Sequence, residues 1–324
     1  MSVLITGVNG LVGVHTANIL LEEGFEVVGY DTNRFGELVF YPEVEKRINF
    51  VWGDITQFPH LLETVEKYRV DGVIHLASLR NEVVYKAYPA ELFRVNIGGT
   101  QNLLELARMG KIEKVVFASS ASVYGKMDDP ARLIPEDAPE NPVGIYANSK
   151  AMCESLFRCY RNVYGVDGLV IRPSRVWGRM ANLETLEFGN PLSSFVYKAL
   201  REEPIRDKSG ADFGGDFSYA PDVAYGFYRA LVTPKPAHWI FNISPGRFYR
   251  LSEVASVLKG LFPKAEISIG PGMDPYVSQS PIRGALDITL AREELSYRVR
   301  YTLKEALEDF IESVRERGGE KALP

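Results

Sequence analysis

The sequence predicts an α/β protein built on a doubly wound parallel sheet, with a smaller and discontinuous C-terminal domain. Short apolar segments rich in Val and Ile alternate with amphipathic segments through the first half of the chain. A glycine-rich turn at residues 6–13 follows the first apolar segment directly and opens the next amphipathic one. Because strands buried on both faces read as continuous apolar runs, this alternation is typical of a parallel sheet with helices on both faces.

Six apolar segments of the first half are expected to be the strands of this sheet, with helices in the amphipathic segments between them. The expected strands are residues 3–6, 26–31, 48–52, 72–77, 114–119 and 169–173. After about residue 174 the alternation weakens, and Gly and Pro cluster at residues 189–191, 210–216 and 270–275.

Three patterns of the second half are still regular. Residues 220–231 predict a helix, residues 238–244 a buried strand, and residues 302–317 a closing amphipathic helix with apolar positions at helical spacing. We therefore expect the chain to return to the sheet. The expected domains are residues 1–174 with a return segment at about 216–245, and a smaller domain at 175–215 and 246–324 that builds the substrate pocket.

Composition restricts the class of protein. The chain has 324 residues, 46% hydrophobic and 24% charged, which is ordinary for a globular protein. A net charge of -5 and a pI near 5.6 argue against a general binder of nucleic acids or anionic membranes. No apolar stretch approaches a membrane span, and the first strand leaves no room for a signal peptide. We expect a cytoplasmic protein without nucleic-acid or membrane partners.

The cysteines and histidines do not indicate a disulfide or a metal site. Cys153 and Cys159 fall in one helical segment, where six residues separate them by roughly 9 Å along the axis, beyond the reach of a disulfide. Both are expected to be reduced. The four histidines are scattered without ligand spacing, so the sequence predicts no metal.

The turn at residues 6–13 reads TGVNGLVG and predicts a dinucleotide site, with a purely structural tight turn as the alternative. Glycines let the backbone approach a pyrophosphate, and the following helix N-terminus supplies N–H groups and a favourable dipole. The candidate cofactor-binding residues here are Gly7, Asn9, Gly10, Leu11, Val12 and Gly13.

Asp31 ends the second expected strand, where a carboxylate can accept hydrogen bonds from the adenosine ribose hydroxyls. Asn33, two residues later, joins the candidate cofactor-binding set. Arg34 offers a contact for a 2′-phosphate, but Asp31 would repel that phosphate, so the sequence favours NAD over NADP. The alternative role for Asp31 is to cap a turn.

Ser120, Tyr146 and Lys150 are the candidate catalytic residues. Tyr146 and Lys150 are four residues apart in a helical segment and so share a face, while Ser120 follows the fifth expected strand. A tyrosine is a poor base at neutral pH until its phenolate is stabilised, and Lys150 with an oxidised nicotinamide supplies the positive charge. Ser120 can donate a hydrogen bond to the same substrate oxygen. An isolated tyrosine and lysine at this spacing would more simply be a surface pair on an amphipathic helix.

With these motifs, the chain resembles the extended short-chain dehydrogenase/reductase superfamily, in the NAD-dependent epimerase/dehydratase branch typified by UDP-galactose 4-epimerase. The resemblance extends over essentially the whole chain. Its matching segments are TGVNGLVG (6–13), GDI (53–55), HLAS (75–78), VNIGGTQNLLELA (95–107), SSASVYG (119–125), YANSK (146–150), IRPSRVWG (171–178) and SYAPDVAYGFYRAL (218–231).

The resemblance implies a Rossmann domain that binds NAD and gives roles to further residues. It places Asp54 and Ile55 beside the adenine, and Pro173 beside the nicotinamide. Lys150 would also bind the nicotinamide ribose, next to Tyr146. The remaining implied cofactor-binding residues are Leu76, Ala77 and Ser78 along the cofactor, and Asn96, which supports the central sheet.

Two departures from the family pattern concern the substrate. The acid pair that dehydratases carry after the catalytic Ser or Thr is Ala121-Ser122 here, which disfavours dehydration. Nucleotide-sugar epimerases usually carry an Arg just before the segment that corresponds to Asp216-Phe217, whereas this chain has Gly214-Gly215. Arginines remain for an anionic substrate. The candidate substrate-binding residues are Arg80, Ser122, Arg175, Arg179 and Arg283, the last resembling a diphosphate-contacting Arg of the family.

The leading hypothesis is an NAD-dependent enzyme that oxidises a secondary hydroxyl of a sugar or sugar derivative, most simply a sugar or nucleotide-sugar epimerase with transient hydride transfer. The alternative is a net dehydrogenase of a non-nucleotide substrate such as a uronic acid, a sugar acid or threonine. From another class, the alternative is a non-catalytic NAD-sensing regulator. The resemblance also implies a homodimer through helices at residues 90–110 and 146–164, with Phe157, Tyr160 and Tyr164 as compatible apolar positions.

Overall fold

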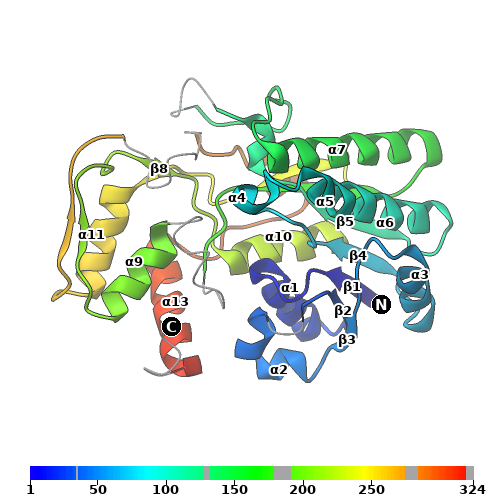
Figure 1. The fold of residues 1–324 in the computed structure, drawn as a ribbon, viewed down its shortest axis with the longest axis horizontal. Coiled ribbons are helices and arrows are strands. Elements are labelled where there is room, and N and C mark those ends of the chain that lie inside the picture. The colour runs from blue at the N-terminus through cyan, green and yellow to red at the C-terminus, as the bar shows by residue number, and fades with distance from the viewer. Residues whose placement is uncertain (34–35, 127–131, 179–190, 274–283, 319–324) are drawn as a thin grey trace.

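The structure, a computed structural model, describes residues 1–33, 36–126, 132–178, 191–273 and 284–318. Figure 1 shows a large sheet with helices on both faces and, beside it, a second lobe that contains α9, α11 and α13. The strands and helices below keep the labels of that figure. Arg34 of the sequence argument lies outside the described residues.

Seven parallel strands form the large sheet in the order β3-β2-β1-β4-β5-β6-β9. Their bounds are β1 Ser2–Thr6, β2 Glu26–Asp31, β3 Asn49–Trp52, β4 Gly72–His75, β5 Lys114–Ala118, β6 Gly168–Pro173 and β9 Ile240–Ile243. The middle strands are buried almost throughout, as the continuous apolar segments predicted. The doubly wound α/β fold is confirmed.

Two helical layers cover this sheet (Figure 1). One core lies against α1 (Leu11–Glu22) and α10 (Ala220–Val232), together with η1 (Glu37–Phe40), α2 (Pro42–Glu45) and α12 (Thr289–Glu294). The opposite core lies against α3 (Phe58–Lys67), α6 (Gly99–Arg108) and α7 (Ile145–Tyr164). Between β4 and α6 the chain forms α4 (Glu82–Tyr85), α5 (Pro89–Phe93) and a π-helical turn, η2 (Arg94–Gly98).

The predicted strands and helices agree with these elements to within two residues at each end. The second strand has the predicted bounds, whereas β4 and β5 end two residues and one residue earlier than predicted. The residues left over, such as Leu76 and Ser119, are the first of the loops at the carboxyl edge. These loop residues resemble strand residues in the sequence because they are themselves buried or half-buried.

The second lobe has a core of its own, shared by α9 (Pro191–Leu200), α11 (Leu251–Leu261) and α13 (Leu303–Gly318). Two small sheets complete it: β8 (Gly214–Gly215) with β10 (Tyr249–Arg250), and β7 (Ile205–Asp207) with β11 (Ile267–Ile269). Between β8 and β10 in the chain, β9 places the predicted return segment in the large sheet beside β6. The division into two domains with the bounds given above stays a prediction.

Three expectations about the helices can be compared with their side chains. Phe157 is fully buried and stacks on Phe117, and Tyr160 is buried and bonded to Glu105 of α6. These two are core residues, while Tyr164 is 54% exposed. Both cysteines of α7 are free. Within the described ranges, no helix is both long and apolar enough to cross a membrane.

Candidate active site

The predicted site segments meet at one edge of the sheet. Parallel strands share the direction of their carboxyl ends, and ligands of open α/β sheets bind in the crevice outside that edge. The glycine turn follows β1, Asp31 ends β2, and residues 76–78 follow β4. Ser120 follows β5, and Pro173 ends β6. The sheet therefore gathers residues from five strands into one region.

Two glycines of the turn are required by the protein itself. Gly7 has φ +74°, and a Cβ there would lie 2.7 Å from the backbone N of Ala77. A Cβ on Gly13 would lie 2.3 Å from the carbonyl O of Gly7, because α1 starts against the turn. Only glycine satisfies both positions, which fixes the turn between the ends of β1 and β4.

Gly10 differs from these two glycines. It is exposed at the N-cap of α1 with φ -83°, which any residue adopts, and the atom nearest to its Cβ would be the Gly7 carbonyl O at 3.2 Å. The first turn of α1 holds no acidic side chain, and the Gly10 N-cap gives it no side-chain hydrogen bond. Asn9 adds a buried Oδ1 that has no hydrogen-bond partner among the described residues. These features fit a pyrophosphate at the start of α1.

Asp31 lies at the adjoining end of β2. One carboxylate oxygen accepts the Asn9 N–H at 3.0 Å and the other accepts the Asn33 N–H at 2.9 Å. Burial raises the pKa of this carboxyl, and these backbone hydrogen bonds oppose the rise. Asn9 also donates from its side chain to the Asn33 carbonyl. The group is held beside the turn, where it suits a ribose, and the same bonds also cap the turn.

Asp54 and Ile55 follow β3. One Asp54 oxygen accepts the Thr56 N–H at 2.9 Å, and the other lies 3.7 Å from the Arg94 guanidinium. Ile55 is buried, and its side chain fills the space over Gly99. The position of this pair stays compatible with the predicted place beside an adenine.

Asn96 connects the loop after β4 with the start of α7. It lies in the π-helical turn η2 and is 2% exposed. Its side chain accepts the Leu79 N–H at 2.8 Å, donates to the Leu79 carbonyl at 2.9 Å, and donates to Ser149 Oγ at 2.9 Å. Ser149 in turn donates to the Tyr146 carbonyl. The amide therefore holds residues 76–79 and the first turn of α7 in one arrangement.

Lys150 and Tyr146 share one face of α7, as their spacing predicts. The Lys150 ammonium is buried, donates to the Ala118 carbonyl at 2.7 Å, and lies 5.6 Å from the centre of the Tyr146 ring. Ser120 begins the short helix η3 (Ala121–Tyr124) just beyond β5, and its Oγ accepts the Ser122 N–H at 3.1 Å. β5 thus positions the lysine and the serine together.

A buried ion pair connects the strands that carry these residues to α7. Arg172 of β6 and Glu154 of α7 are each 1% exposed in their side chains, and they form two hydrogen bonds. Glu154 also accepts a hydrogen bond from Ser119, the neighbour of Ser120. The remaining Arg172 donors reach Tyr124, Glu140 and the Glu136 carbonyl. This network ties the ends of β5 and β6 to α7.

The candidate substrate-binding residues are spread over separate places. Arg80 is exposed after the loop that follows β4, and Ser122 has a buried Oγ without a partner among the described residues. Arg175 is partly buried beyond β6 and has φ +30°. Arg179 and Arg283 lie outside the described residues. Of the predicted arginines that are described, only Arg175 lies beyond β6, the strand next to β5 and its Ser120.

A family profile matches residues 3–244, and its description is the NAD-dependent epimerase/dehydratase family. The chain belongs to this family. Family membership confirms the resemblance found in the sequence, the prediction of an enzyme, and NAD as the cofactor. The chain is 31% identical to UDP-glucuronate 4-epimerase of Thermodesulfobacterium geofontis over 81% of this chain and 80% of that protein.

Solved structures of the family share the fold. UDP-glucose 4-epimerase of Thermus thermophilus, solved in complex with NAD, superposes with a TM-score of 0.79 at 26% identity, covering 97% of this chain and 99% of that chain. UDP-glucose 4-epimerase of Thermotoga maritima, solved with UDP-glucose, gives a TM-score of 0.84 at 23% identity over 98% and 99% of the two chains. The second likeness concerns the fold alone.

Sequence reasoning missed the residues of this family member that support the site. His75, between Thr6 Oγ1 at 2.7 Å and Thr100 Oγ1 at 3.1 Å, joins β1 and β4 to α6. Burial, with the charge of Lys150 acting in the same direction, lowers its pKa to about 3, so the ring is neutral. A usable signal existed for Arg172: a charged residue inside an apolar strand needs a buried partner.

Proposed function

We propose that this protein is a nucleotide-sugar 4-epimerase that acts through Ser120, Tyr146 and Lys150 and keeps its NAD during turnover. The observation that carries the proposal is the arrangement at the end of β5. There the Ala118 carbonyl holds the Lys150 ammonium beside the Tyr146 ring, and Ser120 begins the next turn. This set can take a proton from a secondary hydroxyl and return it.

In this proposal Tyr146 is the acid-base residue. The chemistry that NAD supplies when bound is the reversible acceptance of hydride from the sugar carbon. As the carbon gives up hydride, its hydroxyl proton passes to the Tyr146 phenolate, and the Lys150 charge stabilises that phenolate beforehand. Ser120 donates a hydrogen bond to the same oxygen and so favours its carbonyl form. The proton returns from Tyr146 when the opposite face is reduced.

Two kinds of support bear on the substrate. The relative at 31% identity is named for UDP-glucuronate, and the Thermus relative for UDP-glucose. Ala121 and Ser122 stand where a dehydratase needs a further acid pair, so elimination of water is disfavoured. The alternative of a net dehydrogenase on a non-nucleotide substrate keeps one specific support, which is the glycine at position 215.

The experiment starts with purified protein as isolated. After denaturation, the released NAD(H) is quantified against protein, and the native enzyme is incubated without added NAD with UDP-glucose, UDP-galactose or UDP-glucuronate. Stoichiometric NAD and interconversion of a pair of epimers are expected, with no accumulation of NADH. In D₂O the epimerised carbon should gain no deuterium, because hydride rather than a proton is exchanged.

The opposite result is equally clear. An empty cofactor site, with NADH accumulating when NAD is added to a free sugar acid or threonine, would replace the epimerase by the net dehydrogenase. Tyr164→Phe is the matched control for Tyr146→Phe, since Tyr164 is an exposed tyrosine at the far end of the same helix.

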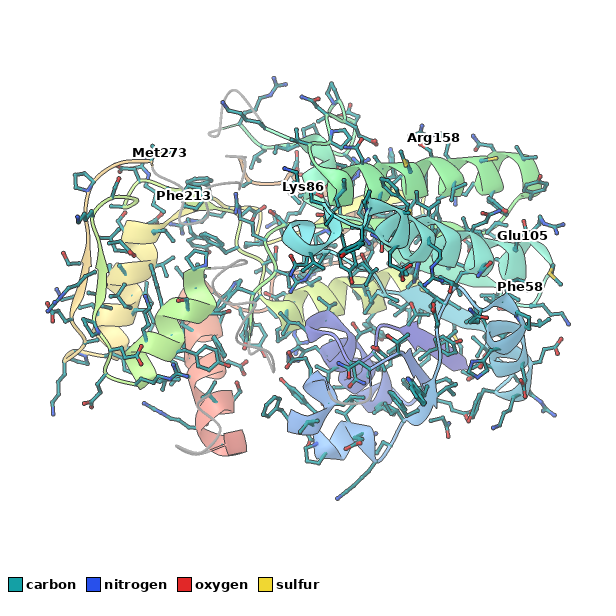
Figure 2. All side chains as sticks on the ribbon, viewed as in Figure 1. Phe58, Lys86, Glu105, Arg158, Phe213 and Met273 are labelled. Atoms are coloured by element: carbon teal, nitrogen blue, oxygen red, sulfur yellow. The ribbon has the colours of Figure 1, made fainter. Side chains whose placement is uncertain are left out.

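The homodimer and the cytoplasmic location predicted from the sequence belong to this proposal. On α7, which Figure 2 shows with Arg158 labelled, Met152, Val163 and Tyr164 are exposed apolar side chains. Light scattering after size exclusion should give twice the chain mass of 36.3 kDa. The double variant Met152→Glu, Tyr164→Glu should have the mass of a single chain. A wild-type protein with the mass of a single chain would contradict the homodimer.

A further inference from the structure

The side chain of Arg175 lies across Gly215, although the two residues are 40 positions apart. A Cβ built on Gly215 would lie 2.4 Å from Arg175 Cδ and 2.6 Å from its Nε. A side chain at position 215 and the present conformation of Arg175 therefore exclude each other. The glycine in β8 leaves a space, and an arginine from another element fills it.

Arg175 comes from the loop beyond β6, at the carboxyl edge where the catalytic candidates gather. Its backbone is anchored on the segment after β8, because its carbonyl accepts the Ser218 N–H and the next bridge joins Trp177 to Tyr219. Its φ of +30° is rare for a residue with a side chain. Residues held in such backbone conformations cluster at ligand sites, where the surroundings enforce them.

The surroundings of this arginine disfavour its charge on balance. Burial lowers the pKa of Arg175 to about 10, with Asp216 acting in the opposite direction, so the guanidinium is charged at neutral pH. Burial raises the pKa of Asp216 to about 7, which favours the protonated form of its carboxyl. One Asp216 oxygen accepts the Leu286 N–H at 2.7 Å, and this hydrogen bond opposes the rise in pKa.

The ring of Phe213, two residues before Gly215, also lies near Arg175, with its centre 5.5 Å from the guanidinium carbon. Figure 2 shows Phe213 in the second lobe, near the upper end of α11. The Arg175 side chain is thus in contact with Gly215 of β8 and close to the ring of Phe213. A planar cation beside an aromatic ring contacts an anion through the donors at its edge.

We propose that Arg175 binds the oxyanion group of the substrate from the loop beyond β6, in the space that a side chain at position 215 would occupy. The inference rests on the proposed function and names the group that selects its substrate class. The oxyanion is either the diphosphate of a nucleotide sugar or the carboxylate of a sugar acid. In this proposal the arginine that the family usually carries near position 215 is replaced by Arg175, which comes from the loop beyond β6.

The test measures binding by calorimetry to NAD-saturated protein, with UDP, uridine and D-glucuronate as separate titrants. Arg175→Asn is the first variant, because Asn tolerates positive φ better than other residues with side chains. It should bind UDP about 10- to 100-fold more weakly, the usual size for charge-assisted hydrogen bonds, with uridine affinity changed less than about threefold. Arg206→Asn, an exposed arginine paired with Glu266 in the same lobe, is the charge-matched control and should leave UDP binding unchanged.

An exchange of positions tests the shared space. Gly215→Arg alone should weaken UDP binding, because the new side chain collides with Arg175. Arg175→Asn combined with Gly215→Arg should bind UDP more tightly than Arg175→Asn, since the cation returns from β8. If Arg175→Asn does not fold, Arg175→Lys and Arg175→Gln replace it in the test. Arg175→Lys keeps the positive charge and should therefore retain more UDP affinity than Arg175→Gln.

The outcomes separate this inference from the proposed function. Wild-type UDP affinity in Arg175→Asn, or an equal loss for uridine, overturns the oxyanion role even if epimerisation is found. A double variant no better than Arg175→Asn overturns the shared space. Binding of glucuronate but not UDP, lost in Arg175→Asn, supports the role of Arg175 and identifies the oxyanion as a carboxylate, while it removes the nucleotide sugar from the proposed function.

Discussion

Arg172 and Arg175 are three residues apart, at the end of β6 and in the loop beyond it, yet their pKa values shift in opposite directions. Arg172 is 1% exposed and gives hydrogen bonds to Glu154, Glu140, Tyr124 and the Glu136 carbonyl. Burial disfavours its charge, but the hydrogen bonds and charge of Glu154 outweigh burial and raise its pKa. For Arg175 burial prevails and lowers the pKa.

The difference distinguishes an arginine that stabilises the fold, Arg172, from one that we propose binds a ligand, Arg175. A buried arginine with a full set of acceptors holds elements together and has no donor left for a ligand. An arginine that keeps some exposed surface, and whose charge the surroundings disfavour, is stabilised by a bound anion. If both proposals hold, the end of β6 lies between the catalytic residues and the residue that binds the substrate oxyanion.

The largest expected effect comes from Arg172→Met. Removing one partner leaves Glu154 as an uncompensated buried charge, which should lower the free energy of unfolding by about 3–5 kcal/mol. Urea unfolding of the NAD-bound protein measures it, with Arg206→Met as a control expected within about 0.5 kcal/mol of wild type. Arg175→Asn should cost much less stability than Arg172→Met, and equal losses would erase the distinction between the two arginines.

Tyr146→Phe should reduce turnover by at least about 10²-fold, the usual contribution of a positioned acid-base group. Retained NAD and UDP affinity should stay close to wild type, because the hydroxyl acts on the reacting oxygen only. Steady-state kinetics with calorimetry separates these quantities. If Tyr146→Phe lowers kcat alone while Arg175→Asn mainly raises KM, the two residues act in different steps, one in the chemical reaction and one in substrate binding. Turnover of Tyr146→Phe near that of wild type would remove Tyr146 from the mechanism.

Asp31→Ala tests the cofactor end of the same edge. The loss of hydrogen bonds to a charged acceptor should weaken NAD binding about tenfold or more. NADP should lose less, because the repulsion of its 2′-phosphate by the carboxylate is removed at the same time. Fluorescence titration with both dinucleotides measures the ratio, and an unchanged preference would leave Asp31 with the turn-capping role alone.

Asp216→Asn is expected to change how the stability of the protein depends on pH. The folded carboxyl has its pKa raised to about 7, above its ordinary value of 3.8, so its stabilising contribution is full below about pH 4 and is lost as the pH rises through 7. Wild type should therefore lose stability relative to Asp216→Asn between about pH 4 and 7, and the difference should stay constant at higher pH. The buried His75 acts in the opposite direction below about pH 6.5, but equally in both proteins. Parallel pH slopes would contradict the raised pKa.

The sequence predicted the parts of the fold and site that local spacing decides. The glycine turn at 6–13 and the pair Tyr146 and Lys150 are short patterns whose geometry follows from one turn or one helix face. The positions of the strands followed from continuous apolar segments. The roles of these residues in catalysis and binding stay predictions until the variants are made.

What the sequence could not predict depends on pairs of distant residues. The bond between Arg172 and Glu154 joins a strand and a helix, and the contact of Arg175 with Gly215 joins the loop beyond β6 to β8. In the sequence Arg175 was one of five candidates and Gly215 only a departure from the family pattern. Neither residue carries a local signal for the other, because the packing of β8 against the loop beyond β6 decides their contact.

Because residues Arg94–Gly98 form a π-helical turn, the number of residues between α5 and α6 determines how the Asn96 side chain is oriented. Deleting a single residue there would allow α5 and α6 to join as one regular helix. The residues before the deletion would then be rotated by about 100° relative to those after it. The Asn96 amide could no longer reach Leu79 and Ser149 together, and the first turn of α7 would lose its support. A one-residue deletion in a helix without catalytic side chains would thus disturb Tyr146 from a distance.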